Sequence, residues 1–126
     1  MKKVLMSVLA VLFFAGISFA AALQAPEEFS TKVSGKTIKE VAKAIEDGAK
    51  RRSWQVEKNK DNSYTLTLFN RQHEIVVLAK YSATGWTIIY KDSKNMKYDA
   101  RKNLIHPNYN RWVQSLDNTI RNYANQ

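Results

Sequence analysis

The stretch from Trp54 to Asp92 constrains the fold more than any other part of the chain, because apolar and polar residues alternate along it. Alternation with a period of two is typical of β-strands that bury one face. It predicts four short strands, near residues 54–57, 64–69, 73–81 and 86–91. The connections between them are short and polar, which implies that neighbouring strands are antiparallel. We therefore expect a four-stranded antiparallel meander.

An amphipathic helical pattern lies on each side of this meander. The first begins at Thr37, whose hydroxyl can cap the helix while Glu40 completes a capping box. Its apolar residues recur at helical spacing: Ile38, Val41, Ala42, Ile45 and Ala49. Gly48 in this pattern predicts either an early end of the helix or a closely packed neighbour, because glycine disfavours helix interiors.

The second helical pattern begins after Pro107, with Asn108 as its expected N-cap. Its apolar stripe is Tyr109, Trp112, Val113, Leu116, Ile120 and Tyr123. The face expected to meet water is Asn110, Arg111, Gln114, Asp117, Asn118 and Arg121. The predicted fold class is therefore α+β in two layers, with the element order helix, four strands, helix (α-β-β-β-β-α).

The middle of the sheet looks apolar on both faces, because residues 75–79 and 88–90 are continuous apolar runs. The helices can cover only one face. We expect residues 24–36, or a curl of the sheet, to shield the other face. The alternative is a bare patch that binds a protein partner, and its candidate residues are Phe69, Val76, Leu78 and Ile89.

The first 22 residues have the pattern of a secretory signal peptide. Lys2 and Lys3 precede an apolar run over residues 4–14, and small residues follow, so cleavage is expected after Ala20 or Ala22. A retained membrane anchor is the alternative, since the apolar stretch could just span a bilayer. Residues 23–36 are then a linker or docked arm, and residues 37–126 form a single α+β domain. The expected location is the periplasm or outside the cell.

The chain has no cysteine, so we expect neither disulfides nor a lipid anchor, which needs a cysteine at the cleavage point. Without Lys2 and Lys3, 18 basic residues remain against 11 acidic ones, a net charge of +7. This charge favours an anionic envelope component as partner, although excess lysine can also serve solubility alone. Nucleic acid does not suit the expected compartment. Another envelope protein is the alternative partner, and the chain is expected to be a monomer or homodimer.

The segment 92–107 is long for a loop in a small domain, and such loops are often functional. Together with the start of the second helix it gathers polar and aromatic residues around a helix N-terminus, which attracts anions. The candidate ligand-binding residues are Tyr90, Ser93, Tyr98, His106, Tyr109, Asn110 and Arg111. Each of them also has an ordinary structural interpretation, as a turn, cap or core residue.

Neither a metal site nor a cofactor is predicted. Two histidines without cysteines or clustered carboxylates do not form the usual ligand set. Ser93, His106 and Asp92 could form a hydrolytic triad only on paper, because no nucleophile elbow or oxyanion loop accompanies them.

The end of the chain has the pattern I-H-x-x-Y-N-x-W, from Ile105 to Trp112. The residues that precede this pattern and carry the same resemblance to a known family are Trp54, Arg71, His73, Tyr90, Asp92, Ser93, Asn95, Met96 and Tyr98. Over nearly the whole mature chain this protein resembles a family of small exported bacterial proteins, many of them lipoproteins. The resemblance implies a helix, β-meander, helix fold and no established activity. The chain lacks the lipid-bearing cysteine of the lipoprotein members.

These observations favour a non-catalytic binding or accessory module of the envelope, for an anionic or carbohydrate ligand. The first alternative is an interaction subunit or inhibitor that docks through the apolar sheet face. The second is a small enzyme.

Overall fold

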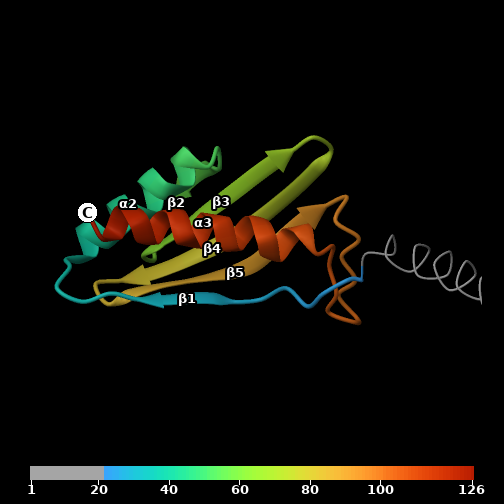
Figure 1. Ribbon diagram of the computed structural model, residues 1–126, viewed down its shortest axis with the longest axis horizontal. Coiled ribbons are helices and arrows are strands. Elements are labelled where there is room, and N and C mark those ends of the chain that lie inside the picture. The colour runs from blue at the N-terminus through green and yellow to red at the C-terminus, as the bar shows by residue number, and fades with distance from the viewer. Residues whose placement is uncertain (1–21) are drawn as a thin grey trace, which may run out of the picture.

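Five antiparallel strands form one sheet in the computed structural model, which describes residues 22–126 (Figure 1). The order across the sheet is β1-β5-β4-β3-β2. The strands are β1 (Phe29–Lys32), β2 (Gln55–Lys58), β3 (Ser63–Asn70), β4 (His73–Ser82) and β5 (Gly85–Lys94). Strands β2 to β5 form the expected meander, so the predicted α+β class is confirmed. The predicted signal peptide and its cleavage sites lie outside the described residues.

The predicted number of strands was wrong, because part of the arm forms a fifth strand. Phe29–Lys32 pairs with β5 in the register Phe29↔Ile88 to Lys32↔Gly85. A Cβ atom at Gly85 would overlap the carbonyl oxygen of Thr31, so the close approach of β1 depends on this glycine. Strand β1 therefore lies at the edge of the sheet.

Both helices lie on the same face of the sheet, which gives the expected two layers (Figure 1). Helix α2 (Ile38–Arg51) begins with the predicted capping box: Glu40 N–H donates to Thr37 Oγ1 at 3.1 Å, and Thr37 N–H donates to Glu40 Oε1 at 2.9 Å. Helix α3 (Asn108–Ala124) does not use Asn108 as its N-cap. Instead Asn108 N–H donates to the ring nitrogen Nδ1 of His106 at 3.0 Å.

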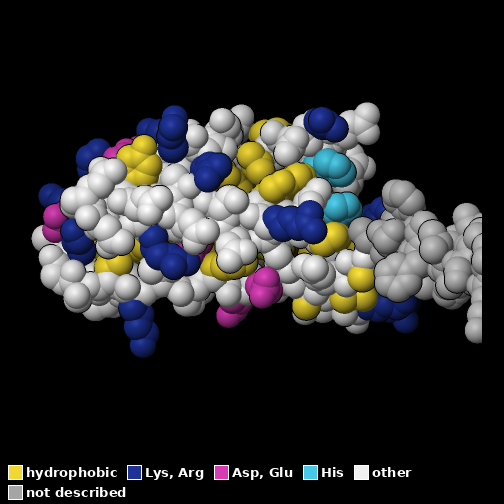
Figure 2. Space-filling model, in the orientation of Figure 1, with side chains coloured by type: hydrophobic (Ala, Val, Ile, Leu, Met, Phe, Trp, Pro, Cys, Tyr) yellow, Lys and Arg dark blue, Asp and Glu magenta, His cyan; other side chains and the backbone are white. Residues whose placement is uncertain are grey.

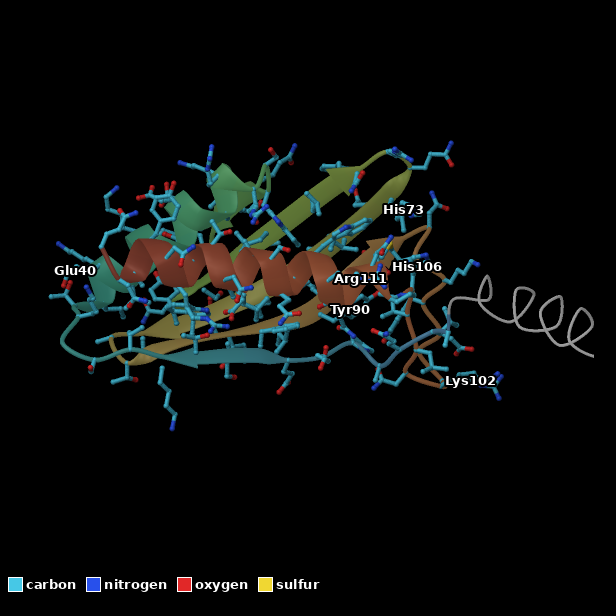
Figure 3. All side chains as sticks on the ribbon, in the orientation of Figure 1. Glu40, His73, Tyr90, Lys102, His106 and Arg111 are labelled. Atoms are coloured by element: carbon cyan, nitrogen blue, oxygen red, sulfur yellow. The ribbon has the colours of Figure 1, made fainter. Side chains whose placement is uncertain are left out.

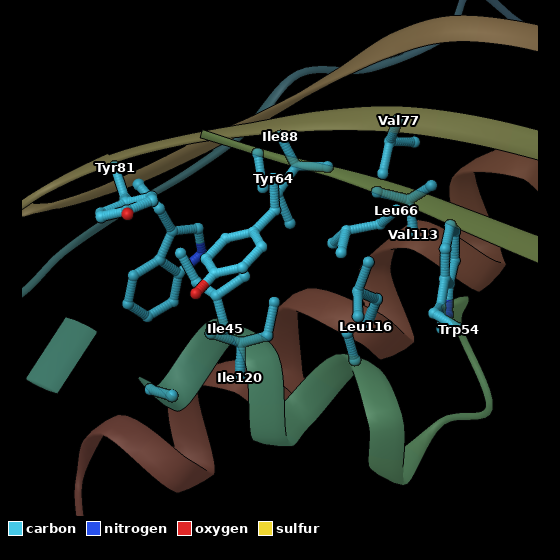
Figure 4. Close-up of a cluster of buried hydrophobic side chains, with 14 of the residues drawn as sticks. Ile45, Trp54, Tyr64, Leu66, Val77, Tyr81, Ile88, Val113, Leu116 and Ile120 are labelled. Carbon is cyan, nitrogen blue, oxygen red and sulfur yellow. The ribbon is translucent and has the colours of Figure 1, made fainter. Parts of the chain in front are cut away.

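The core lies between the helices and the sheet (Figure 4). Alternate residues of β4 point into it, so Ile75, Val77 and Ala79 are all fully buried. Leu116 of α3 is buried as expected, and Trp112 packs against the same core while remaining half-buried.

The two helices cross closely at Gly48. A Cβ atom at this position would lie 2.8 Å from Cα of Ile120. Helix α2 continues to Arg51, so of the two explanations for Gly48 the close neighbour is the correct one.

Neither helix covers the opposite face of the sheet. The shielding that we expected from residues 24–36 is wrong, because hydrogen bonding to β5 places β1 beside the sheet rather than over it. Phe69 is 54% exposed on this face, while Val76, Leu78 and Ile89 are half-buried. We call these four residues the open-face patch.

Asp117 corrects the predicted polar face of α3, because it is buried with 1% exposure. Its carboxylate accepts from the Trp86 indole at 2.7 Å and from the Thr31 hydroxyl at 3.2 Å. Arg121 donates to it at 2.7 Å. One side chain thus connects α3 to β1 and β5.

Candidate functional site

One end of the molecule brings together the end of β5, the loop 95–107 and the start of α3. The loop is held in place from inside, because Met96 and Ile105 are buried and His106 N–H donates to the Met96 carbonyl at 2.8 Å. Asn95 and Lys97 have φ values of 58° and 54°, in the left-handed region that tight turns use. The loop therefore has a fixed conformation, and the β5 side chains can form a site beside it.

A β-bulge shapes the end of β5. Val76 pairs with Asp92 and Val77 pairs with Tyr90, so Lys91 is the additional residue. The bulge changes which side chains share a face. Tyr90 and Ser93 thereby come together, with 2.8 Å between their hydroxyl oxygens.

Three tyrosines meet beside this bulge. The ring centroids of Tyr98 and Tyr90 are 4.4 Å apart, with 31° between the ring planes. The Tyr109 ring meets Tyr90 edge-on, with 5.5 Å between the ring centroids. Tyr109 is fully buried, and its hydroxyl has no hydrogen-bond partner among the described residues. Burial raises the pKa of Tyr109 and also that of Tyr90, so both phenols are neutral near pH 7. Tyr98 is 38% exposed and presents this cluster to solvent.

An open groove of about 520 Å³ runs along this cluster. We call it the end groove, and its lining residues are Tyr90, Lys91, Asp92, Ser93, Asn95, Met96, Lys97 and Tyr98. Its volume falls in the range of small-molecule sites, roughly 300–1,000 Å³. The combination of an aromatic pair, a hydroxyl, an amide and two lysines can bind a ligand that is both ring-shaped and anionic.

His106 lies at the same end, beside His73 of β4 (Figures 2 and 3). The two imidazole centroids are 6.1 Å apart, and His73 also lies 5.9 Å from the Trp112 ring. Burial, together with neighbouring His73, Lys97 and Arg111, lowers the pKa of His106 below its usual value. Positive charge therefore converges on this end of the molecule.

The hydrogen bonds of the two histidines determine their tautomers. His106 Nδ1 accepts from a backbone N–H, so the neutral ring carries its proton on Nε2 and cannot bind a metal there. His73 Nδ1 lies 2.6 Å from the Asn95 carbonyl, which can only accept, so this nitrogen is protonated. Residues 22–126 also contain no cluster of three or more His, Cys, Asp or Glu side chains placed to hold a metal ion.

Asn110 does not face the end groove. Its amide donates to Gln24 Oε1 at 3.1 Å and to the Ala25 carbonyl at 3.0 Å, and its Oδ1 accepts from Glu27 N–H at 2.9 Å. This predicted site residue is buried and holds the arm against α3. These three hydrogen bonds use most of the hydrogen-bonding capacity of the Asn110 amide, so little of it remains for a ligand.

The candidate residues thus do not all line one site. Tyr90, Ser93 and Tyr98 line the end groove, whereas Tyr109 packs beneath it. Arg111 is exposed in the first turn of α3 and lies 3.4 Å from Asn108 Oδ1. The side chains of Ser93, His106 and Asp92 are not hydrogen-bonded to one another as a catalytic triad would be. The Ser93 hydroxyl instead hydrogen-bonds Tyr90, and His106 hydrogen-bonds the backbone of α3.

The sequence did not single out Lys91, Asn95 and Lys97 as site residues. The only available signal was at Asn95, because asparagine is enriched among residues with positive φ. The bulge that places Lys91 at the groove depends on pairing with β4 and has no pattern of its own in the sequence.

Neither protein-family models, nor curated proteins, nor solved structures show a match to this chain. The resemblance to the exported bacterial family therefore stays a prediction. Within the described part of the chain, no helix has the length and hydropathy needed to cross a membrane.

Proposed function

We propose that the protein is a non-catalytic binding module of the bacterial envelope, periplasmic or secreted, which binds an anionic carbohydrate in the end groove. The observation that carries the proposal is the Tyr90–Tyr98 pair, 4.4 Å apart, in a groove that also contains Lys91 and Lys97. An aromatic face offers a sugar ring a flat apolar surface, while hydroxyl and amide groups supply directed hydrogen bonds.

Charge supports an anionic ligand over a neutral one. Asp92 is the one carboxylate lining the groove among the described residues, and its Oδ1 already accepts from Ser93 N–H at 2.8 Å. The two lysines therefore leave the groove with net positive charge. Arg111 adds charge at the same end of the molecule (Figure 3). Long-range attraction to a phosphate or carboxylate follows, and it weakens as salt screens the charges.

The test uses a glucosamine disaccharide with and without phosphate groups, followed by amide chemical shifts in NMR titrations. We expect the phosphorylated disaccharide to shift the amides of residues 90–98, and the unphosphorylated sugar to bind more weakly. Tyr98→Ala should weaken binding by roughly tenfold, about 1.4 kcal/mol. Lys97→Ala should weaken it by roughly two- to fivefold, about 0.4–1 kcal/mol. Lys39→Ala, which removes an exposed charge from α2, is the matched control and should bind as the wild type does.

Two results would count against this function. One is a folded Tyr98→Ala protein that binds as tightly as the wild type. The other is a set of shifts that avoids residues 90–98 altogether. Arg111→Ala provides a graded check, because loss of one peripheral charge should weaken binding mainly at low salt.

The open-face patch supports a second candidate function, protein interaction through the sheet. Its residues are exposed or half-buried on a face that neither helix covers. Leu78→Lys would place a charge in the centre of this face. We expect this variant to lose a partner that the wild type captures from envelope extract, while retaining disaccharide binding. Capture that is unaffected by Leu78→Lys would place the interaction elsewhere.

A further inference from the structure

The open face of the sheet has a regular pattern on its central strand, β4. Residues 74, 76, 78 and 80 point away from the helices, because residues 75, 77 and 79 point into the core. Glu74 and Lys80 are each three residues from Val77, and Val76 and Leu78 are each one residue from it. The strand therefore presents one acid, two aliphatic residues and one base in a symmetric series.

This series is complementary to itself when reversed. A two-fold axis that crosses β4 above Val77 places the strand antiparallel over its copy. Glu74 of one copy then faces Lys80 of the other, twice, and Val76 faces Leu78. Isologous contacts of this kind are the usual basis of homodimers.

The neighbouring strands fit the same arrangement. Ile89 pairs with Leu78, and Thr65 pairs with Leu78 from the other side, so the face around Leu78 is aliphatic and threonine-rich, while Asp92 lies beside Val76. Lys94 lies 3.8 Å from Glu74 on the same face. Glu74 would therefore lie between two lysines, one from its own chain and one from its copy.

We propose that this face binds a second copy of the chain, with the sheets packed face to face and Glu74 of each copy paired to Lys80 of the other. The proposal rests on the second candidate function, in which the open-face patch binds protein. Packed sheets lie about 10 Å apart, and their strands cross at roughly 30°. Over the roughly 10 Å from Val77 to each charge, this angle shifts the partner by about one strand spacing. Glutamate and lysine side chains are long enough to span that shift.

The area is sufficient for a weak dimer. Three long strands and two short ones at strand spacings of about 4.8 Å give a face of roughly 500 Å² per copy. The pair would bury roughly 1,000 Å², the lower limit for a specific interface. The wild-type protein should therefore associate reversibly in the micromolar range rather than form an obligate dimer.

The test is sedimentation equilibrium of the wild type and of two charge reversals, Glu74→Lys and Lys80→Glu. We expect the wild type to dimerise. Each variant alone should associate at least roughly tenfold more weakly, because like charges then face each other twice. An equimolar mixture of the two variants should regain dimers. In the mixed dimer the introduced lysine of one variant faces the introduced glutamate of the other, and the second contact is the native Glu74–Lys80 pair. Lys39→Glu makes the same charge change on exposed α2 and should dimerise as the wild type does.

A wild type that stays monomeric to high micromolar concentration overturns the proposal. So do charge reversals that dimerise normally, and so does a mixture that fails to regain dimers. Circular dichroism checks that each variant is folded. If the wild type is monomeric but Leu78→Lys still abolishes capture of an envelope protein, self-association is wrong and the protein-binding face is retained.

Discussion

The indole nitrogen of Trp86 donates a 2.7 Å hydrogen bond to the buried carboxylate of Asp117, which joins the first residues of β5 to the middle of α3. The same carboxylate accepts from Thr31 on β1 and from Arg121. One side chain therefore connects the edge strand, the sheet and the helix layer.

Asp117→Ala should lower the free energy of unfolding by about 2–4 kcal/mol, because it leaves a buried indole N–H without a partner and removes an ion pair. The Arg121 side chain is 47% exposed, so its charge can be rehydrated, which keeps the loss from being larger. Chemical denaturation measures the change. Asp47→Ala removes a solvent-exposed pair with Lys43 and should cost much less, so equal losses would contradict the assigned role.

Gly48→Ala tests the crossing of the two helices. On helix propensity alone the change would stabilise by about 1 kcal/mol. The added methyl group would lie 2.8 Å from Ile120 Cα, a backbone atom that cannot rotate away. We therefore expect a net loss of about 1–3 kcal/mol in thermal or chemical unfolding. Asn118→Ala on the exposed side of α3 is the control and should stabilise slightly, whereas a stabilising Gly48→Ala would mean that the helices can separate.

Periodicity was enough to predict the meander and both helices. Alternation is a local property: it repeats over the eight residues of β3, and Trp54 and Val56 alternate with polar residues at β2. Strands β4 and β5 combine some alternation with a central apolar run. Strand β1 contains only one apolar residue, Phe29, so it has no alternation to read. That strand is held by its pairing with β5 and by the contact between Thr31 and Gly85, both of which join residues far apart in the chain.

The buried polar residues of α3 show the same limit. Asn110 and Asp117 lie on the face that the helical pattern assigns to water, and nothing local marks them as different. Their partners, the arm at Gln24 and the indole of Trp86, come from other elements. The candidate site was predicted only in part for this reason. Tyr90, Ser93 and Tyr98 line the same groove, but the bulge that completes the groove arises from strand pairing.

His106 should make stability depend on pH between about 7 and 5. The native pKa of His106 lies below its ordinary value of 6.5, so the unfolded chain binds the proton more readily. Stability is therefore complete above about pH 6.5 and declines as pH falls through the native pKa. Protonation also places a hydrogen on Nδ1, which removes the acceptor for Asn108 N–H.

Urea denaturation across this pH range measures the effect. His106→Asn keeps a side-chain acceptor near the start of α3 but does not titrate, so its stability should change less between pH 7 and pH 5. Glu40 and Glu46 have pKa values lowered below 4.5, and they add their own loss only at more acidic pH. A wild type whose stability rises as the pH falls from 7 to 5 would contradict the assigned protonation state.

Asn110→Ala tests whether the I-H-x-x-Y-N-x-W segment serves the scaffold, since the Asn110 amide forms three hydrogen bonds that tie α3 to residues 24–27. The variant leaves Glu27 N–H and Gln24 Oε1 to find water, and it should cost about 1–2 kcal/mol of stability. Hydrogen exchange should become faster at Glu27 and along β1, while the amides of β4 keep their protection. Asn108→Ala is the matched control, because the Asn108 side chain bonds Arg111, at 3.4 Å, and not the arm, so it should leave exchange in β1 unchanged. Unchanged hydrogen exchange at Glu27 and along β1 in the Asn110→Ala variant would show that β1 pairing with β5 holds this segment without help from α3.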